Sequence, residues 1–269
     1  MRRSSRPLYD ARKRKRRIIG KILLYFIFLV LIFVCLVLFF RADFLRISKV
    51  SVGGVGAADA GEIEDYIWSE LDNKILGFIP RANSFVYPRK KIEEGILAQF
   101  QEVEKIDLDL KSLKSLSVNL TLRSPFALWC GSEASDQCFF LSKEGLIFDE
   151  AGDYSDGVYL KFHGLVSGEP VGARYLDPQS FALVNQFIED IRGLGLSPLS
   201  LSPISENSYE LMVEGGAIIF SESQNFGDAI TNLSSVLADS SLDVFADGEL
   251  QAESLDLRFG NKVIIKRNN

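Results

Sequence analysis

An uninterrupted apolar run of 19 residues, Ile22 to Phe40, sets the strongest limit on how this chain of 269 residues can fold. As a helix that rises about 1.5 Å per residue, the run spans roughly 28 Å, close to the hydrocarbon thickness of a bilayer. A secretory signal peptide has a shorter apolar region, of ~7 to 15 residues, and a small-residue cleavage site, and neither feature is present. The run therefore predicts a transmembrane helix that stays on the mature protein.

Charge is distributed unevenly on the two sides of this run. Residues 1–41 hold 11 Lys and Arg against one Asp, whereas the rest of the chain holds 19 basic and 35 acidic residues. Because the basic run Arg12 to Arg17 directly precedes the apolar segment, the positive-inside tendency places the tail 1–21 in the cytoplasm and residues 42–269 outside. The acidic exterior part argues against nucleic acid and against an anionic membrane surface as partners.

The first exterior segment, residues 44–124, shows the pattern of a compact α+β module. Apolar and polar residues alternate at 46–52, 103–110 and 116–122, which predicts strands with one buried face. Helical spacing predicts helices at 62–71 and 90–100, so the order is strand, helix, helix, strand, strand. Asp59 offers a helix-start side chain, and one face of the second helix is expected to carry Ile92, Ile96, Leu97 and Phe100.

Residues 125–266 show mostly β patterns and are followed by a polar tail, 267–269. Two tripeptides, KEG at 143–145 and EGG at 214–216, join apolar strand-like segments and predict hairpins. Two segments, 181–191 and 226–237, instead carry apolar residues at helical spacing. The fold class expected for the whole chain is α+β: one N-terminal membrane helix, a β-α-α-β-β module, and a mostly antiparallel β domain with two helices.

Few residues in the sequence could carry chemistry. Cys130 and Cys138 flank a polar loop, and either a disulfide in an oxidising compartment or two free thiols would fit this spacing. The single histidine, His163, ends a strand-like segment, and no CxxC pair supplies further zinc ligands. No GxSxG or HExxH motif occurs. We therefore expect no catalytic residues, no metal, no cofactor and no small-molecule substrate.

One pair of carboxylates supports a competing hypothesis. Asp107 and Asp109 form an Asp-x-Asp, and a tethered sugar transferase could use such a pair to hold a metal and nucleotide phosphates. Strand alternation by itself also predicts two solvated carboxylates at these positions. Exchanging both for Asn separates the two readings, because an enzyme would lose its activity.

Several motifs together resemble the FtsQ/DivIB family of bacterial cell-division proteins, in which the module after the membrane is a POTRA domain. RSPFALW, Arg123 to Trp129, is similar to the family's Pro-x-Ala-x-Trp join between the two domains. FFLSKEGLIFDEAG is similar to its Asp-x-x-Gly-x-x-Phe hairpin, although Ser142 replaces the usual Asp. LVNQFIEDIRGLGL, YELMVEGGAIIF, ITNLSSVLAD and LDLRFGNKVIIK follow in the family's order. The segment between the two module helices is longer than in the common pattern.

The resemblance implies a non-enzymatic scaffold at the division septum that binds FtsB/DivIC-like and FtsL-like single-pass coiled-coil proteins and helps control septal wall synthesis. It also implies β-strand addition at the last strand. Leu255, Leu257 and Phe259 are then expected to pack inward, and Gly260-Asn261 to form a bulge or tight bend. The expected partner-binding residues are Phe259, Lys262, Val263, Ile264 and Ile265. A POTRA protein of secretion or envelope assembly is the remaining alternative.

Strand addition at the last strand also predicts how a shortened chain folds and binds its partner. Ending the chain at Glu253 is expected to leave the exterior part largely folded but unable to capture the partner. If the last strand is instead central to its sheet, this truncation should unfold the domain.

Overall fold

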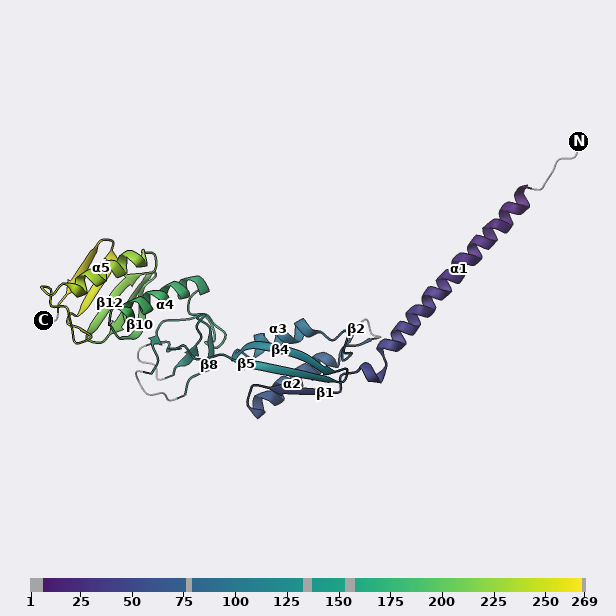
Figure 1. The fold of residues 1–269 in the computed structure, drawn as a ribbon, viewed down its shortest axis with the longest axis horizontal. Coiled ribbons are helices and arrows are strands. Elements are labelled where there is room, and N and C mark those ends of the chain that lie inside the picture. The colour runs from purple at the N-terminus through teal and green to yellow at the C-terminus, as the bar shows by residue number, and fades with distance from the viewer. Residues whose placement is uncertain (1–6, 76–78, 133–136, 153–157, 268–269) are drawn as a thin grey trace, which may run out of the picture. The chain divides into compact units, whose positions relative to one another are not determined.

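A computed structural model of the chain describes residues 7–75, 79–132, 137–152 and 158–267 (Figure 1). The chain divides into two compact units, Met1–Leu122 and Arg123–Asn269. Residues 1–6 of the basic tail and 268–269 of the polar tail lie outside the described part. The structure confirms a mixed fold of helices and sheet strands.

The first unit begins with one long helix, α1 (Pro7–Phe40). Its segment Ile18–Phe40 is long and apolar enough to cross a membrane, and a membrane anchor or a signal sequence would both have these properties. The apolar side chains of this segment are exposed along its length. A short 3-10 helix, η1 (Asp43–Leu45), follows.

A three-stranded sheet with two helices completes the first unit. The elements are β1 (Lys49–Gly53), α2 (Ala57–Leu71), α3 (Arg89–Gln99), β4 (Val103–Ser112) and β5 (Ser115–Leu122). Two very short strands, β2 (Lys74–Ile75) and β3 (Ile79–Pro80), pair between the helices. The sheet order is β1-β5-β4, with β1 parallel and β4 antiparallel to β5.

The core of this module lies between the two helices and the middle of the sheet. Helix α2 contributes Ile63, Ile67 and Leu71, and α3 contributes Ile92 and Ile96. These side chains pack against Val50, Val103, Leu108, Leu116, Val118 and Leu120 of the sheet strands.

Three local expectations about the module are wrong. Leu97 is 38% exposed because α3 packs through the narrower stripe Ile92, Ile96 and Phe100. Leu110, near the end of β4, and Leu122, the last residue of β5, are also exposed, so the core does not extend to these strand ends. Helix α2 begins before Asp59, which therefore lies in the first turn, and its N-cap residue is Gly56.

The second unit is built on one nine-stranded sheet. Its order is β16-β15-β12-β11-β10-β9-β6-β7-β8, and antiparallel neighbours outnumber parallel ones. The bounds are β6 (Ala127–Trp129), β7 (Phe139–Leu141), β8 (Ile147–Glu150), β9 (Lys161–Phe162), β10 (Pro198–Ser205), β11 (Ser208–Val213), β12 (Gly216–Ser221), β15 (Ser254–Phe259) and β16 (Lys262–Lys266). A separate small pair is formed by β13 (Phe245–Ala246) and β14 (Glu249–Leu250).

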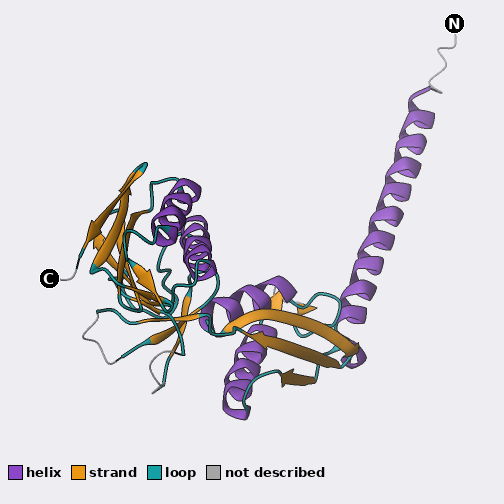
Figure 2. Cartoon of the chain, turned by 60° about the vertical axis from the view of Figure 1, so that its left-hand side comes forward, coloured by secondary structure: helices purple, strands orange, loops and turns teal. Residues whose placement is uncertain are grey.

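Two helices, α4 (Pro178–Gly193) and α5 (Phe226–Ala238), lie beside this sheet (Figure 2). The side chain of Asp177 caps α4, and that of Asn225 caps α5, by accepting hydrogen bonds from first-turn N–H groups. Apolar residues of both helices and of the sheet strands form one hydrophobic core. The helices therefore cover one face of the sheet.

The two predicted hairpins are present. Gly145 between β7 and β8 has φ +75°, and Gly215 between β11 and β12 has φ +85°. Glycine adopts this left-handed conformation without steric cost, which explains its place in both turns. A Cβ added at Gly215 would also lie 2.1 Å from the carbonyl oxygen of Leu250.

Candidate partner-binding edge

The C-terminal stretch predicted as one bent strand is a hairpin of two strands. Gly260 and Asn261 form the turn between β15 and β16, and Gly260 has φ +66°. Strand β15 lies between β12 and β16, and β16 is the last strand in the sheet order. The bend expected at Gly260-Asn261 is therefore a tight turn. Of the two strands of this hairpin, only β16 lies at an edge of the sheet.

Inward packing holds for two of the three residues expected to show it. Leu255 is 0% and Leu257 is 2% exposed, and both belong to the core. Phe259 is 50% exposed, so its predicted inward position is wrong. The ladder between β15 and β16 is irregular between Asp256 and Phe259, and the alternation that buries the two leucines ends there. The Phe259 ring instead lies 6.0 Å from the guanidinium of Arg258.

A two-residue ion pair occupies the irregular part of β15. The side-chain nitrogens of Arg258 donate to both carboxylate oxygens of Asp256 at 2.6 to 3.2 Å, and the backbone N–H of Arg258 donates to the same group at 3.1 Å. Burial alone would raise the pKa of Asp256, but these hydrogen bonds outweigh it and hold that pKa below its ordinary value. Asp256 is therefore a charged residue that stabilises the bulge.

Strand β16 is held at both ends by contacts with other parts of the second unit. At the turn, Asn232 of α5 donates to the carbonyl oxygen of Gly260 at 2.9 Å. At the far end, Lys266 pairs with Glu253, and Arg267 donates to the carbonyl oxygen of Leu242 at 2.9 Å. The strand is therefore ordered without a partner.

Side chains of β16 divide between the two faces of the sheet. Val263 and Ile265 are half-buried and pack against the core, whereas Ile264 is 50% exposed on the opposite face. Lys262 and Lys266 are exposed on the same side as Ile264, as strand alternation requires. The exposed face of β16 thus presents one apolar side chain between two cations.

The backbone of β16 is open on the side that faces away from β15. Because Phe259 and Lys262 pair directly across a two-residue turn, the N–H and C=O of Lys262 point toward β15. Directions alternate along a strand, so the N–H and C=O groups of Val263 and Ile265 point away from the sheet. Among the described residues no strand pairs with this side of β16. These groups can therefore receive an added strand.

The opposite edge of the same sheet is different. Ile147 of β8 donates its N–H to the carbonyl oxygen of Ala173 at 2.9 Å, and Gly172 donates to the carbonyl oxygen of Ile147 at 2.8 Å. Leu146 also bridges to Arg174. The segment around Ala173 thus covers the start of β8, and β16 is the better candidate for strand addition.

The structure also places the other residues singled out in the sequence. Asp107 and Asp109 are exposed on β4, opposite Asn119 and Ser117 of β5. His163 follows β9, is buried, and donates from Nδ1 to the carbonyl oxygen of Cys130 at 2.9 Å. In the described ranges no group of three or more His, Cys, Asp or Glu could hold a metal ion.

Of the two alternatives left open for the cysteines, the structure has the disulfide. Cys130 and Cys138 are bonded, with 4.3 Å between their Cα atoms. Four residues of the intervening loop, 133–136, lie outside the described part. The bond closes the stretch between β6 and β7, far along the sheet order from β16.

Sequence reasoning missed the groups that position the edge. The amide of Asn232 holds the β15–β16 turn, a contact that no local pattern around this residue indicates. A hollow of about 310 Å³ lies beside this contact, between the first turn of α5 and the turn. An Asp-x-Arg within a strand is the one signal that could have indicated the Asp256–Arg258 pair.

Neither a scan against protein-family models nor a search of curated proteins finds a match for the chain.

Proposed function

We propose that this chain is a non-enzymatic, membrane-anchored scaffold of the bacterial division machinery, related to the FtsQ/DivIB family. Helix α1 would anchor it in the plasma membrane with the N-terminus in the cytoplasm and both units outside. Strand β16 would bind an FtsB/DivIC-like protein, with an FtsL-like protein in the same complex, and so help control septal wall synthesis. The single observation that supports this best is the ordered, unpaired edge of β16.

Three further features support the proposal. The long elements of the first unit follow the strand-helix-helix-strand-strand order of a POTRA domain. The RSPFALW stretch lies at the start of the second unit, where Ala127 and Trp129 of β6 are buried. The order of the other resembling motifs along the chain is also that of the family.

The proposal is tested by removing one outward N–H group from β16. Val263→Pro removes that donor, and Pro is tolerated in an edge strand where the N–H faces solvent. Val263→Ala is the control, because it also removes the branched side chain of Val263 but keeps the donor. A hydrogen bond contributes about 0.5–1.5 kcal/mol, so the affinity of the Pro variant for the FtsB/DivIC-like protein should be roughly 2- to 10-fold or more below that of the Ala variant.

Affinity is measured with the full-length chain in detergent and the purified FtsB/DivIC-like and FtsL-like proteins of the same organism. Equal affinity of the Pro and Ala variants would contradict strand addition at β16. Absence of binding by the unchanged chain, together with a fluorescent fusion that does not gather at the division septum, would contradict the scaffold function itself.

A further inference from the structure

The segment between α2 and α3 is attached to the end of α1. Asn83 is 1% exposed, and its Nδ2 donates to the carbonyl oxygen of Phe40, the last residue of α1, at 2.7 Å. Its Oδ1 accepts the backbone N–H of Phe85 at 2.9 Å. A helix end leaves carbonyl groups without partners inside the helix. One buried side chain therefore satisfies such a carbonyl and connects it directly to the inter-helix loop.

Backbone contacts strengthen this attachment. Ile47 donates to the carbonyl oxygen of Ala82 at 2.7 Å, and Ser84 donates to that of Leu45 at 2.9 Å. Leu45 and Ile47 are each 1% exposed. The residues that follow α1 and those of the loop thus form a short antiparallel contact, which keeps residues 80–88 beside the exit of the helix.

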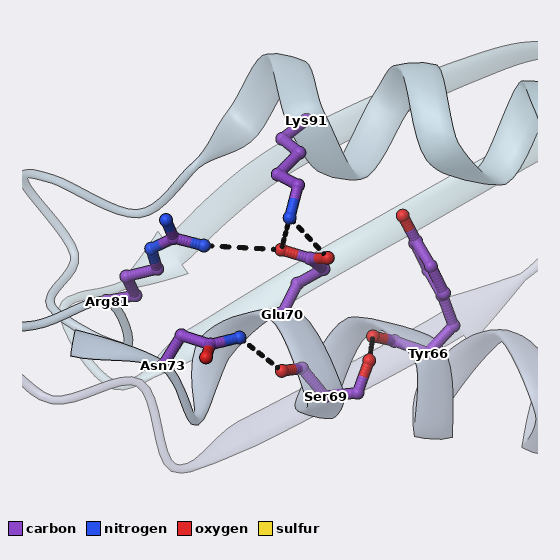
Figure 3. A network of polar contacts seen from close by, with 6 residues as sticks. All are labelled: Tyr66, Ser69, Glu70, Asn73, Arg81 and Lys91. Atoms are coloured by element: carbon purple, nitrogen blue, oxygen red, sulfur yellow. Dashed lines mark hydrogen bonds and ion pairs between the residues drawn. The ribbon is translucent and has the colours of Figure 1, made fainter. Parts of the chain in front are cut away.

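Polar side chains fix the other side of the loop (Figure 3). Glu70 of α2 accepts from Arg81 at 3.5 Å and from Lys91 of α3 at 2.8 Å. Asn73 donates to the carbonyl oxygen of Ser69 at 3.1 Å, near the end of α2. Because the loop contacts α1, α2 and α3, it is positioned as part of the first unit.

Two aromatic rings are exposed in this region. Phe85 of the loop is 63% exposed, and Phe44 of η1 is 50% exposed. The Phe44 ring lies 5.9 Å from that of Phe39 in the last turn of α1. Exposing rings of this size to water is unfavourable, and Phe is one of the apolar residues that interfacial segments bury at the boundary between headgroups and acyl chains.

The local charge also differs from that of the rest of the exterior part. Residues 74–91 hold five Lys and Arg and no Asp or Glu, although residues 42–269 are acidic in total. Three of the five are paired: Arg81 and Lys91 with Glu70, and Arg89 with Glu93. A basic segment close to a membrane is attracted by anionic headgroups, each cation contributing about 1 kcal/mol near the surface.

We propose that this membrane-proximal surface, residues 80–88 with Phe44, contacts the lipid headgroups of the outer leaflet and inserts the rings of Phe44 and Phe85 into the interface. The proposal rests on α1 spanning the membrane, as proposed above. The 23 residues of Ile18–Phe40 would cover roughly 34 Å as a helix, so Phe40 would lie at the bilayer surface and Asn83 directly beside it. We propose lipid as the binding partner of this surface because α1, the membrane helix, ends directly beside the loop.

This contact changes the expectation drawn from the overall charge. An acidic average argues against an anionic membrane as a partner, but residues 80–88 contain no Asp or Glu and are followed directly by the cations Arg89, Lys90 and Lys91. The α+β module of the first unit would then contact the membrane through a defined surface and would not be connected to α1 by a flexible linker alone.

Spin labels on the full-length chain test the contact. The chain is reconstituted into vesicles of phosphatidylethanolamine and phosphatidylglycerol and labelled at the native Cys35 of α1, or at Phe85→Cys or Phe259→Cys in a Cys35→Ser background. Phe259 is the matched control, because it is another half-exposed Phe but belongs to the second unit. Collisions with lipid-soluble oxygen and with a water-soluble nickel complex are compared.

We expect the oxygen-to-nickel ratio to be highest at position 35, several-fold lower at position 85, and lowest, as in water, at position 259. A water-like ratio at position 35 would contradict membrane anchoring itself. A membrane-like ratio at position 35 with equal ratios at positions 85 and 259 would overturn this inference alone. Protection of position 85 from both reagents would also overturn it, because a protein would then cover the loop.

Asn83→Ala in the chain labelled at position 85 supplies a second test. Loss of the link to Phe40 should lower the oxygen-to-nickel ratio at position 85 and leave the ratio at position 35 unchanged. An unchanged ratio at both positions, in a variant whose circular dichroism matches that of the parent, would show that the Asn83 link does not place the loop in the interface.

Discussion

Ending the chain after Asn261 is expected to leave the second unit folded, whereas ending it after Glu253 is expected to unfold it. The longer deletion removes Leu255 and Leu257, which are fully buried. Losing a buried leucine costs about 2–5 kcal/mol, so the pair accounts for roughly 4–10 kcal/mol. A domain is stable by only about 5–15 kcal/mol, and this loss takes most of it.

The shorter deletion costs much less. It removes only β16, whose core-facing Val263 and Ile265 are half-buried. Full burial of such a side chain contributes about 1.5–3 kcal/mol, so two half-buried ones contribute roughly the value of one. The remaining unit would keep its helices and β15, and lose the candidate edge.

The place of β15 in the sheet opposes one expectation from the sequence. A chain ending at Glu253 was expected to stay folded because the whole terminal stretch was treated as an edge. The structure places β15 between β12 and β16, so its removal also uncovers β12. A chain that ends there would therefore not separate loss of binding from loss of folding.

Limited proteolysis of the two shortened chains in detergent measures the difference, with urea midpoints as the quantitative readout. Full-length Leu257→Ala and Ile264→Ala are matched controls, because the first residue is buried and the second is half exposed. The first should cost about 2–5 kcal/mol and the second no more than about 0.5 kcal/mol. Equal protease resistance of both shortened chains would refute the reasoning.

Three further predictions concern stability. Gly215→Ala, at φ +85° and facing a carbonyl oxygen of β14, should cost more than about 2 kcal/mol, whereas Gly193→Ala, with nothing within 4 Å, should be tolerated in thermal melts. Asp256, whose pKa lies below the ordinary value, stabilises the fold above about pH 4 and loses this contribution as the pH falls further; Asp256→Asn should flatten that part of the pH profile of the urea midpoint. Exchanging Cys130 and Cys138 for Ser should cost roughly 2–3 kcal/mol in the same assay.

Local patterns in the sequence were sufficient to identify the buried face of α4. Helical spacing identified Phe181, Val184, Ile188 and Ile191 of α4, and all four are buried. This works because a 3.6-residue period reports which side of a helix faces the core, whatever lies across from it. The glycine at 145 likewise indicated its hairpin, because a left-handed residue constrains the turn locally.

The order of the strands could not be read in the same way. Strand β15 pairs with β12 in parallel, across a stretch that contains α5 and the β13–β14 pair. Such pairing depends on contacts between distant parts of the chain, which leave no periodic signal in either segment. The sequence therefore did not show whether Leu255 lies in a central or an edge strand. For the same reason it did not show whether a chain that ends at Glu253 would fold.

The bulge and the turn were ambiguous for a related reason. Gly260-Asn261 suits either a G1 bulge within one strand or a two-residue hairpin turn between two strands, since both require a residue with positive φ. The structure contains both features, the turn at this dipeptide and the irregularity earlier, beside the Asp256–Arg258 pair. The early irregularity moves Phe259 out of the core, which alternation counted from Leu255 cannot anticipate.

The composition of β16 suits reversible pairing. An open edge invites uncontrolled association, and a short strand with lysines discourages it. Lys262 and Lys266 flank Ile264 on the exposed face, so a second copy of β16 aligned antiparallel would bring like charges together. A partner strand with an apolar residue opposite Ile264 and acidic residues opposite the lysines would pair favourably. The same side chains that suppress self-association would thus select the partner.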